Sequence, residues 1–327
     1  MPTNPCNIEF YKSKTEILSE DEESATIQIS DDNGRYLMTV YQVFPGIQFI
    51  YSAAHIQSVR FEERNTTSDS IFEISHCREG RLERNVNGEF WYLSPGDLAI
   101  VRMNSVSRST YFPLRHYHGI TVRIDLDKTP KCLSCLLDDV TVRPKAIAEK
   151  FCGEKGGFVA RANPSFTRIF AELYSVPSAI KKGYFKIKTL ELLLFLSAWD
   201  VNQDEFGART YTKAQVDLAK GISRYMTEHM DDRITLDRLS EYFHISGAYI
   251  KKTFKGVYGV SVGAFIRAQK MESAAYMLEC TDKSILEIAG LHGYDNGSKF
   301  ASAFRTIKGV NPAEYRNANC KNRILSI

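Results

Sequence analysis

The chain has 327 residues, of which 43% are hydrophobic and 25% are charged, and its net charge is +3. This length is sufficient for two domains that each have their own core. The sequence contains no run of the roughly eighteen apolar residues that a membrane span needs, and no secretory signal at its N-terminus. The seven cysteines are odd in number and scattered, which is typical of reduced thiols. We therefore expect a cytoplasmic protein without a membrane partner.

Residues 1–160 are predicted to form one domain of short β-strands. Turn signals such as Pro45 followed by Gly46 separate the strands, and Asn87 followed by Gly88 is a strong hairpin signal. Many short strands at this spacing favour a β-sandwich or a small barrel. The predicted strands are runs rich in aromatic and β-branched residues at 37–41, 48–52, 71–77, 81–86, 90–93, 98–103 and 119–124.

Residues 161–201 are predicted to be helical, with helices at 166–176 and 181–200. The second helix contains more leucines than a half-buried helix usually carries. Its apolar surface is expected either to pair with a second subunit or to pack on the chain's own barrel. Residues 202–213 are polar and contain glycine, which predicts a linker. The candidate dimerisation residues are Ile187, Leu190, Leu194 and Phe195.

Residues 214–327 contain one short pattern twice, with a spacing of fifty residues. Each copy follows an apolar, helix-length run and a short polar break. A helix, a tight turn and a second helix with exposed cations is the layout of a helix-turn-helix. Two such units in tandem predict an all-α domain that reads adjacent segments of a DNA major groove. The corresponding residues are Ile250, Phe254 and Gly259 in the first copy and Phe300, Phe304 and Gly309 in the second.

The apolar spacing also predicts which positions of each second helix face outward. Ile250 and Phe254 are four residues apart, as are the two corresponding phenylalanines, so these side chains are expected to face the core. The first outer face carries three lysines and the second is nearly neutral, so we expect base discrimination mainly from the first unit. The alternative is that the lysines form only a solvated face. The candidate DNA-binding residues are Ala248, Tyr249, Lys251, Lys252, Lys255, Ser298, Lys299, Ser302 and Arg305.

The region from Ala214 to Arg316 resembles the DNA-binding domain of AraC/XylS-type transcription regulators. The match is densest in residues 285–289, 293–294 and 298–300. Lys270 departs from the arginine that relatives usually carry in the helix between the two units. From Val216 to the end there are 16 lysines and arginines against 12 acidic residues, an excess that suits phosphate binding. The resemblance implies base contacts from Ala248, Lys251, Lys252, Ser298 and Ser302.

Residues 36–125 resemble the cupin-like sensor half of the same regulators. The similarity lies in Glu73 and Ile74, the Asn87 hairpin, and the segment 93–97 with Pro95, Gly96 and Asp97. It implies a β-barrel that holds an organic effector among aromatic side chains, with an arginine binding an anionic group. A barrel filled by its own side chains is equally consistent with the composition. The candidate ligand-binding residues are Arg78, Arg81, Trp91, Tyr92, His116 and His118.

No metal or other cofactor is expected. Metal-dependent cupins present paired histidines, a carboxylate and a later histidine inside the barrel. His116 and His118 form the only H-x-H of this sequence, and no carboxylate accompanies them at metal-ligand spacing. Cys132 and Cys135 form the only C-x-x-C, but no second pair completes four ligands.

The sequence as a whole predicts an α+β protein with a cupin-like β-barrel, a helical dimerisation segment and an all-α DNA-binding domain. The expected function is that of a ligand-responsive transcription regulator, by family habit an activator, which bridges two DNA half-sites as a homodimer. An activator would also contact RNA polymerase. We do not expect an enzyme. One alternative, a DNA-repair methyltransferase fused to a similar DNA-binding unit, would need a four-cysteine zinc site and a Pro-Cys-His nucleophile, and the sequence has neither. Two further hypotheses are a cupin enzyme and a regulator that has no effector.

Overall fold

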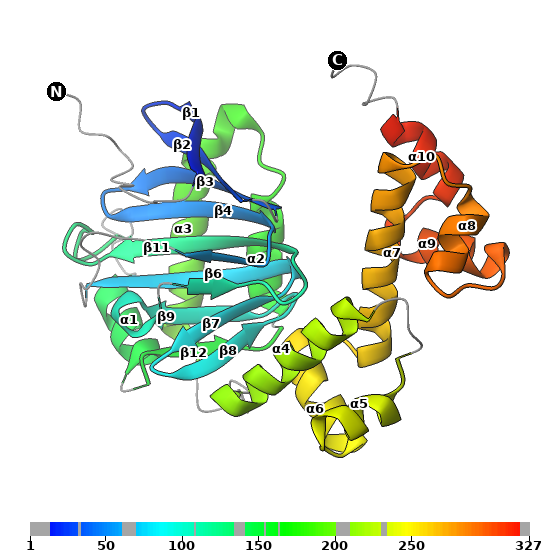
Figure 1. Ribbon diagram of the computed structural model, residues 1–327. Coiled ribbons are helices and arrows are strands. Elements are labelled where there is room, and N and C mark those ends of the chain that lie inside the picture. The colour runs from blue at the N-terminus through cyan, green and yellow to red at the C-terminus, as the bar shows by residue number, and fades with distance from the viewer. Residues whose placement is uncertain are drawn as a thin grey trace. The chain divides into compact units, whose positions relative to one another are not determined.

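The structure is a computed structural model that describes residues 14–31, 34–60, 70–107, 109–133, 141–153, 155–162, 164–200, 210–229 and 234–320. The chain forms two compact units, residues 1–212 and 213–327. The first unit contains the strands and the second is helical (Figure 1). No helix among the described residues is long and apolar enough to cross a membrane.

The first unit contains two antiparallel sheets (Figure 1). The larger has the order β1-β2-β3-β4-β11-β6-β9-β12, and the smaller has the order β5-β10-β7-β8. The strands of the larger sheet are β1 (Lys14–Glu20), β2 (Ser24–Asp31), β3 (Gly34–Phe44), β4 (Ile47–His55), β6 (Ile71–Gly80), β9 (Leu98–Arg102), β11 (Tyr117–Asp125) and β12 (Gly157–Ala160). Those of the smaller sheet are β5 (Ser58–Arg60), β7 (Leu82–Val86), β8 (Glu89–Leu93) and β10 (Ser109–Tyr111).

The seven predicted strands are confirmed as β3, β4, β6, β7, β8, β9 and β11. The predicted closed barrel is not confirmed, because the described strands form two separate sheets. The larger sheet buries one face against the smaller sheet and the other against helices. It therefore covers its apolar surfaces by stacking layers, as a sandwich does, and does not need to join its edges.

Three helices cover the outer face of the larger sheet: α1 (Pro144–Cys152), α2 (Pro164–Leu173) and α3 (Lys181–Ala198). The helix α2 presents one apolar stripe to the sheet, because Phe166, Ile169, Phe170 and Leu173 recur at helical spacing. Two short 3₁₀ helices, η1 (Met103–Ser105) and η2 (Ser178–Ile180), complete the unit. The predicted linker, apart from residues 210–213, and Cys135 lie outside the described residues.

The second unit contains seven helices among its described residues. Its longest helix, α7, joins two groups of shorter ones (Figure 1). The helices are α4 (Lys213–Glu228), α5 (Leu236–Phe243), α6 (Gly247–Tyr258), α7 (Val262–Cys280), α8 (Ile285–Leu291), α9 (Gly297–Lys308) and α10 (Pro312–Cys320).

The interior of the first unit holds a buried charge network. The carboxylate of Glu73 on β6 is 2.7 Å from Nη1 of Arg84 and 3.0 Å from Nε of Arg123. Burial alone would raise the pKa of Glu73, but the two guanidinium groups outweigh it through charge and hydrogen bonds and hold the pKa at about 2. The carboxylate is therefore ionised in the native state at neutral pH.

We expect this network to make the stability of the first unit depend on pH. A carboxyl group whose pKa falls on folding stabilises the native state above its unfolded pKa, about 4.3 for glutamate, and loses that contribution as the pH falls towards the folded value. Urea unfolding between pH 5 and pH 2 should show a steep loss of stability in the wild type and a shallower one in Glu73→Gln. At neutral pH this variant should lose about 3–5 kcal/mol, because two partly buried arginines lose their partner. Glu89→Gln, at an exposed position, is the control, and equal slopes for Glu73→Gln and the wild type would contradict the prediction.

Candidate DNA-binding surface

The first helix-turn-helix consists of α5 and α6. The chain leaves α5 through His244, whose φ of 54° is left-handed, and the N–H of Ile245 donates to the carbonyl of Ser240. The helix α6 begins after Ser246, whose hydroxyl accepts a hydrogen bond from the N–H of Tyr249 at 3.4 Å. Ser246 is therefore the N-cap of α6, and it satisfies one of the free amides at the start of the helix.

The helix α6 has one buried face and one exposed face. Phe254 stacks on Tyr258 with ring centroids 4.4 Å apart, and Ile250 is fully buried. These contacts fix the rotation of the helix about its axis, so the side chains on the opposite face point to solvent. The exposed residues are Ala248, Tyr249, Lys251, Lys252 and Lys255.

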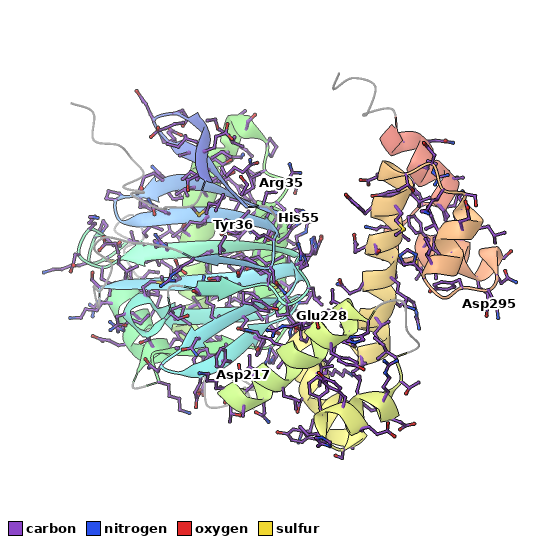
Figure 2. The ribbon with its side chains drawn as sticks, viewed as in Figure 1. Arg35, Tyr36, His55, Asp217, Glu228 and Asp295 are labelled. Atoms are coloured by element: carbon purple, nitrogen blue, oxygen red, sulfur yellow. The ribbon has the colours of Figure 1, made fainter. Side chains whose placement is uncertain are left out.

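The second helix-turn-helix consists of α8 and α9. Ser284 and Glu287 form a capping box at the start of α8, and the Asn296 side chain accepts hydrogen bonds from two amides at the start of α9. Figure 2 labels Asp295, in the turn immediately before α9. Phe300 and Phe304 are fully buried, as predicted. The exposed residues of α9 include Ser298, Lys299, Ser302 and Arg305.

The sequence repeat is also a structural repeat. Gly259 ends α6 with φ 78° and ψ −13°, and Gly309 ends α9 with φ 78° and ψ −19°. In each case the glycine N–H donates to the carbonyl four residues earlier, at Lys255 and at Arg305. Ser261 then caps α7, and Asn311, fifty residues later, bonds the N–H of Glu314 in α10. The second helices of the two helix-turn-helix motifs therefore end in the same way.

Some cations of this unit support the fold and do not face outward. Nζ of Lys270 on α7 donates to the carbonyl of His292, at the C-terminal end of α8, at 3.0 Å. A cation at this end of a helix is favoured by the free carbonyls and the helix dipole. Nζ of Lys308 pairs with Glu272 at 2.5 Å. Lys270, at the position where relatives usually carry arginine, thus connects α7 to the second helix-turn-helix.

The predicted ligand-binding residues of the first unit lie in three separate places. Trp91 is buried in the core between the two sheets. Tyr92, the next residue, belongs to the opposite face of β8, where Arg81 lies over its ring and Tyr211 packs at 5.4 Å. The structure therefore does not bring the six candidates together around one cavity. The third place, at the ends of β6 and β11, holds Arg78, His116 and His118.

Two residues near these histidines were not singled out from the sequence. His55 ends β4, and its ring centroid lies 5.2 Å from that of His116. Oε2 of Glu79 on β6 lies 3.5 Å from Nε2 of His116 and 3.8 Å from Nδ1 of His118. Neither residue is close to the H-x-H in sequence, so only the strand register could have identified them.

Comparison with known proteins agrees with the geometry of the second unit. A family model described as a helix-turn-helix domain matches residues 239–318. The chain is 32% identical over 99 residues to the transposon Tn10 TetD protein of Escherichia coli, covering 30% of this chain and 72% of that protein. This chain belongs to the AraC/XylS family of transcription regulators. Its second unit is the DNA-binding domain of that family.

Two further comparisons cover different shares of the matched chains. The transcriptional regulator Rob of Salmonella typhimurium is 29% identical over 105 residues, which is 32% of this chain and 36% of Rob. A solved structure of a probable AraC family regulator from Rhodopseudomonas palustris is 24% identical, with a TM-score of 0.30, and covers 32% of this chain and 97% of that chain.

The glycine that ends α9 provides a test of the repeated geometry. Gly309→Ala should destabilise the protein by about 1–2 kcal/mol, because an alanine must adopt the left-handed conformation there. Gly263→Ala is the matched control, since Gly263 lies inside α7 with no atom within 4 Å of an added Cβ. This second change should stabilise by about 0.5–1 kcal/mol. Thermal unfolding measures both, and a stabilising Gly309→Ala would contradict the assigned helix end.

Proposed function

We propose that this protein is a sequence-specific DNA-binding regulator that responds to an effector and acts as a dimer. The observation that carries the proposal is the pair of helix-turn-helix units whose second helices, α6 and α9, keep a row of polar and cationic side chains exposed. A second helix of this kind enters the major groove and reads base edges. Cations alongside it bind phosphate and fix the register.

The two helices differ in what they offer to DNA. The exposed face of α6 carries Lys251, Lys252 and Lys255, and lysine can donate to O6 and N7 of guanine as well as to phosphate. The face of α9 offers two serines, with Lys299 and Arg305 beside them. We infer that α6 carries most of the base discrimination and that α9 mainly positions the phosphate backbone.

Lys251→Ala/Lys252→Ala tests this assignment. The full-length chain is first used to select preferred genomic fragments, and the affinity of the variant for them is then measured over a salt series. We expect the variant to lose about 1–3 kcal/mol of binding free energy per base contact and to discriminate less against bulk DNA. For each lysine that contacts a phosphate, the slope of log affinity against log salt concentration should be smaller by about one.

The matched control removes the same charge elsewhere. Lys131→Ala/Lys145→Ala changes two exposed lysines of the first unit and should leave sequence preference intact. If the wild type prefers no fragment over bulk DNA, or if the α6 variant keeps its preference, the lysines form only a solvated face.

The dimer is supported by the exposed side of α3. Its inner face, which includes Phe185 and Leu192, packs in the core, while Ile187 is 64% and Leu194 is 42% exposed. Phe195 is exposed as well, and Leu190 is half-buried. Ile187, Leu190 and Leu194 are spaced by three and four residues, so they form an apolar row on the outer side of α3. Such a row can pack against the same helix of a second subunit.

Ile187→Glu/Leu194→Glu should therefore convert the dimer to a monomer, because two carboxylates would lose their hydration at a closed interface. Sedimentation at micromolar concentration measures the state of the full-length chain. Ala171→Glu, at an exposed position of α2, is the control and should remain dimeric. A wild-type monomer, or a dimer unchanged by both substitutions, would argue that α3 is not the interface.

We further infer that the first unit carries the effector response, in a cupin-like domain. Its interior offers polar groups to an organic ligand, among them the Glu73 network and the hydroxyl pair of Ser75 and Thr121, 2.9 Å apart. An effector changes DNA binding only if it favours one arrangement of the protein over another. Activation, with contact to RNA polymerase, follows the habit of the family.

A further inference from the structure

Three histidines and a glutamate gather at one end of the larger sheet, on its outer face. His55 lies on β4, His118 on β11 and Glu79 on β6, which are neighbouring strands, and His116 immediately precedes β11. His118 pairs directly with Glu79 across β11 and β6. Tyr117 pairs with Ala54 across β11 and β4, so continuing the register places His116 opposite His55. Because side chains two residues apart on a strand share a face, the four side chains lie on one side of the sheet.

The outer face is distinct from the interior between the sheets. Ile120 and Val122 follow His118 on the same face of β11 and pack in the core beneath the helices. Tyr117, which points the other way, packs in the core between the two sheets. The histidines therefore lie outside the space in which a barrel ligand was expected. Figure 2 labels His55 close to Arg35, its cross-strand partner on β3, at this end of the sheet.

The backbone holds this cluster in place through two local features. Arg78 is an extra residue on β6, because His118 pairs with Glu79 while Gly119 pairs with Cys77. This bulge turns Glu79 towards the histidines, as bulges commonly re-aim a side chain. At Gly80, with φ 78°, a Cβ would lie 2.0 Å from the carbonyl oxygen of His116. Only a glycine permits the segment that carries His116 to approach β6 so closely.

The distances suit a metal ion. The candidate ligand atoms of His55, His116 and His118 all lie within 4.8 Å of one another. Zinc–nitrogen bonds of about 2.0–2.1 Å in a tetrahedral site place two ligand atoms about 3.3 Å apart, so small side-chain rotations would close the cluster. The side chains of His116 and His118 are 38% and 32% exposed, which leaves an entry path from solvent.

The polar surroundings fit the same ligand. Nε2 of His118 is buried and has no hydrogen-bond partner in the part of the chain that the structure describes. The carboxylate of Glu79 lies on the Nδ1 side of that ring, 3.8 Å away. A carboxylate behind an imidazole, which orients the ring and makes it more basic, is the usual support of a metal-bound histidine. The nearby cation Arg78 is engaged by the Tyr174 ring, at 4.4 Å, and by Glu79.

We propose that His55, His116 and His118 bind a divalent transition-metal ion of the zinc class, with Glu79 as the carboxylate that positions the ligands. Imidazole ligands select zinc, copper, nickel and iron over calcium and magnesium. Three protein ligands leave one position of a tetrahedral ion for water or a small anion. Because the ligands come from separate strands, a bound ion ties β4 to β11 and stabilises the folded first unit. The site is independent of the proposed DNA binding.

The test uses the full-length chain, free of any purification tag and stripped of metal with a chelator, in the absence of DNA. Cobalt(II) is the probe, because its visible absorption reports tetrahedral nitrogen coordination, and zinc is then used to displace it. We expect one cobalt ion per chain, displaced by one zinc ion, and a higher thermal unfolding temperature with zinc.

Variants locate the site. His118→Gln and His55→Gln should each weaken binding at least about tenfold and abolish the tetrahedral spectrum, and Glu79→Gln should weaken it by about 10- to 100-fold. His55 is exposed, so its substitution keeps the test valid if His118→Gln folds poorly. His229→Gln, in the second unit, is the control and should bind as the wild type does.

Two results would overturn the proposal. One is a wild-type chain that binds no cobalt or zinc in the micromolar range. The other is binding that survives both His118→Gln and His55→Gln, or that disappears when the cysteines are alkylated. Neither result bears on the DNA-binding proposal, which is tested with different residues and without added metal.

Discussion

The burial of one aromatic or aliphatic side chain every four residues determines the orientation of α6 and α9. Ile250 and Phe254 in α6, and Phe300 and Phe304 in α9, are fully buried. Thr253, Val257 and Tyr258 of α6 are buried as well and contribute to the same packing. The outward direction of the exposed lysines of α6 depends on this packing. A polar residue at any of the four positions would disturb the exposed face as well as the core.

The first unit depends on a different constraint, the register of the central strands β4, β11 and β6. This register places Ile120 and its neighbours under the helices and Tyr117 between the sheets. It also puts the Glu73 carboxylate within reach of Arg123 on the neighbouring strand β11 and of Arg84 on β7 of the smaller sheet. A shift by one residue would exchange the two faces and leave a carboxylate among the helices.

The second unit could be predicted well from the sequence, because its information is local. Caps, turns and apolar spacing lie within a few residues of one another, as Ser246 and Asn296 illustrate. In the first unit, the positions of seven strands were predicted but their partners were not. Pairing joins residues far apart in the chain, so the meeting of His55 with His116, or of Glu73 with Arg123, had no local signal. For the same reason the strand pattern left a sandwich and a barrel both open, and only the family resemblance implied a barrel.

The exposed faces of α6 and α9 differ in chemistry, because the first carries three lysines and the second carries two serines beside Lys299 and Arg305. The two helix-turn-helix units follow one another through α7, whose 19 residues span about 28 Å at 1.5 Å per residue. On the proposed assignment, in which α6 discriminates bases and α9 positions phosphates, one domain contacts the two ends of its site differently, and the site of a single domain is not expected to be a palindrome. On a promoter with the site in the reverse direction, the bound domain would have the opposite orientation. Under that assignment, the binding site of one domain would have a direction along the chromosome.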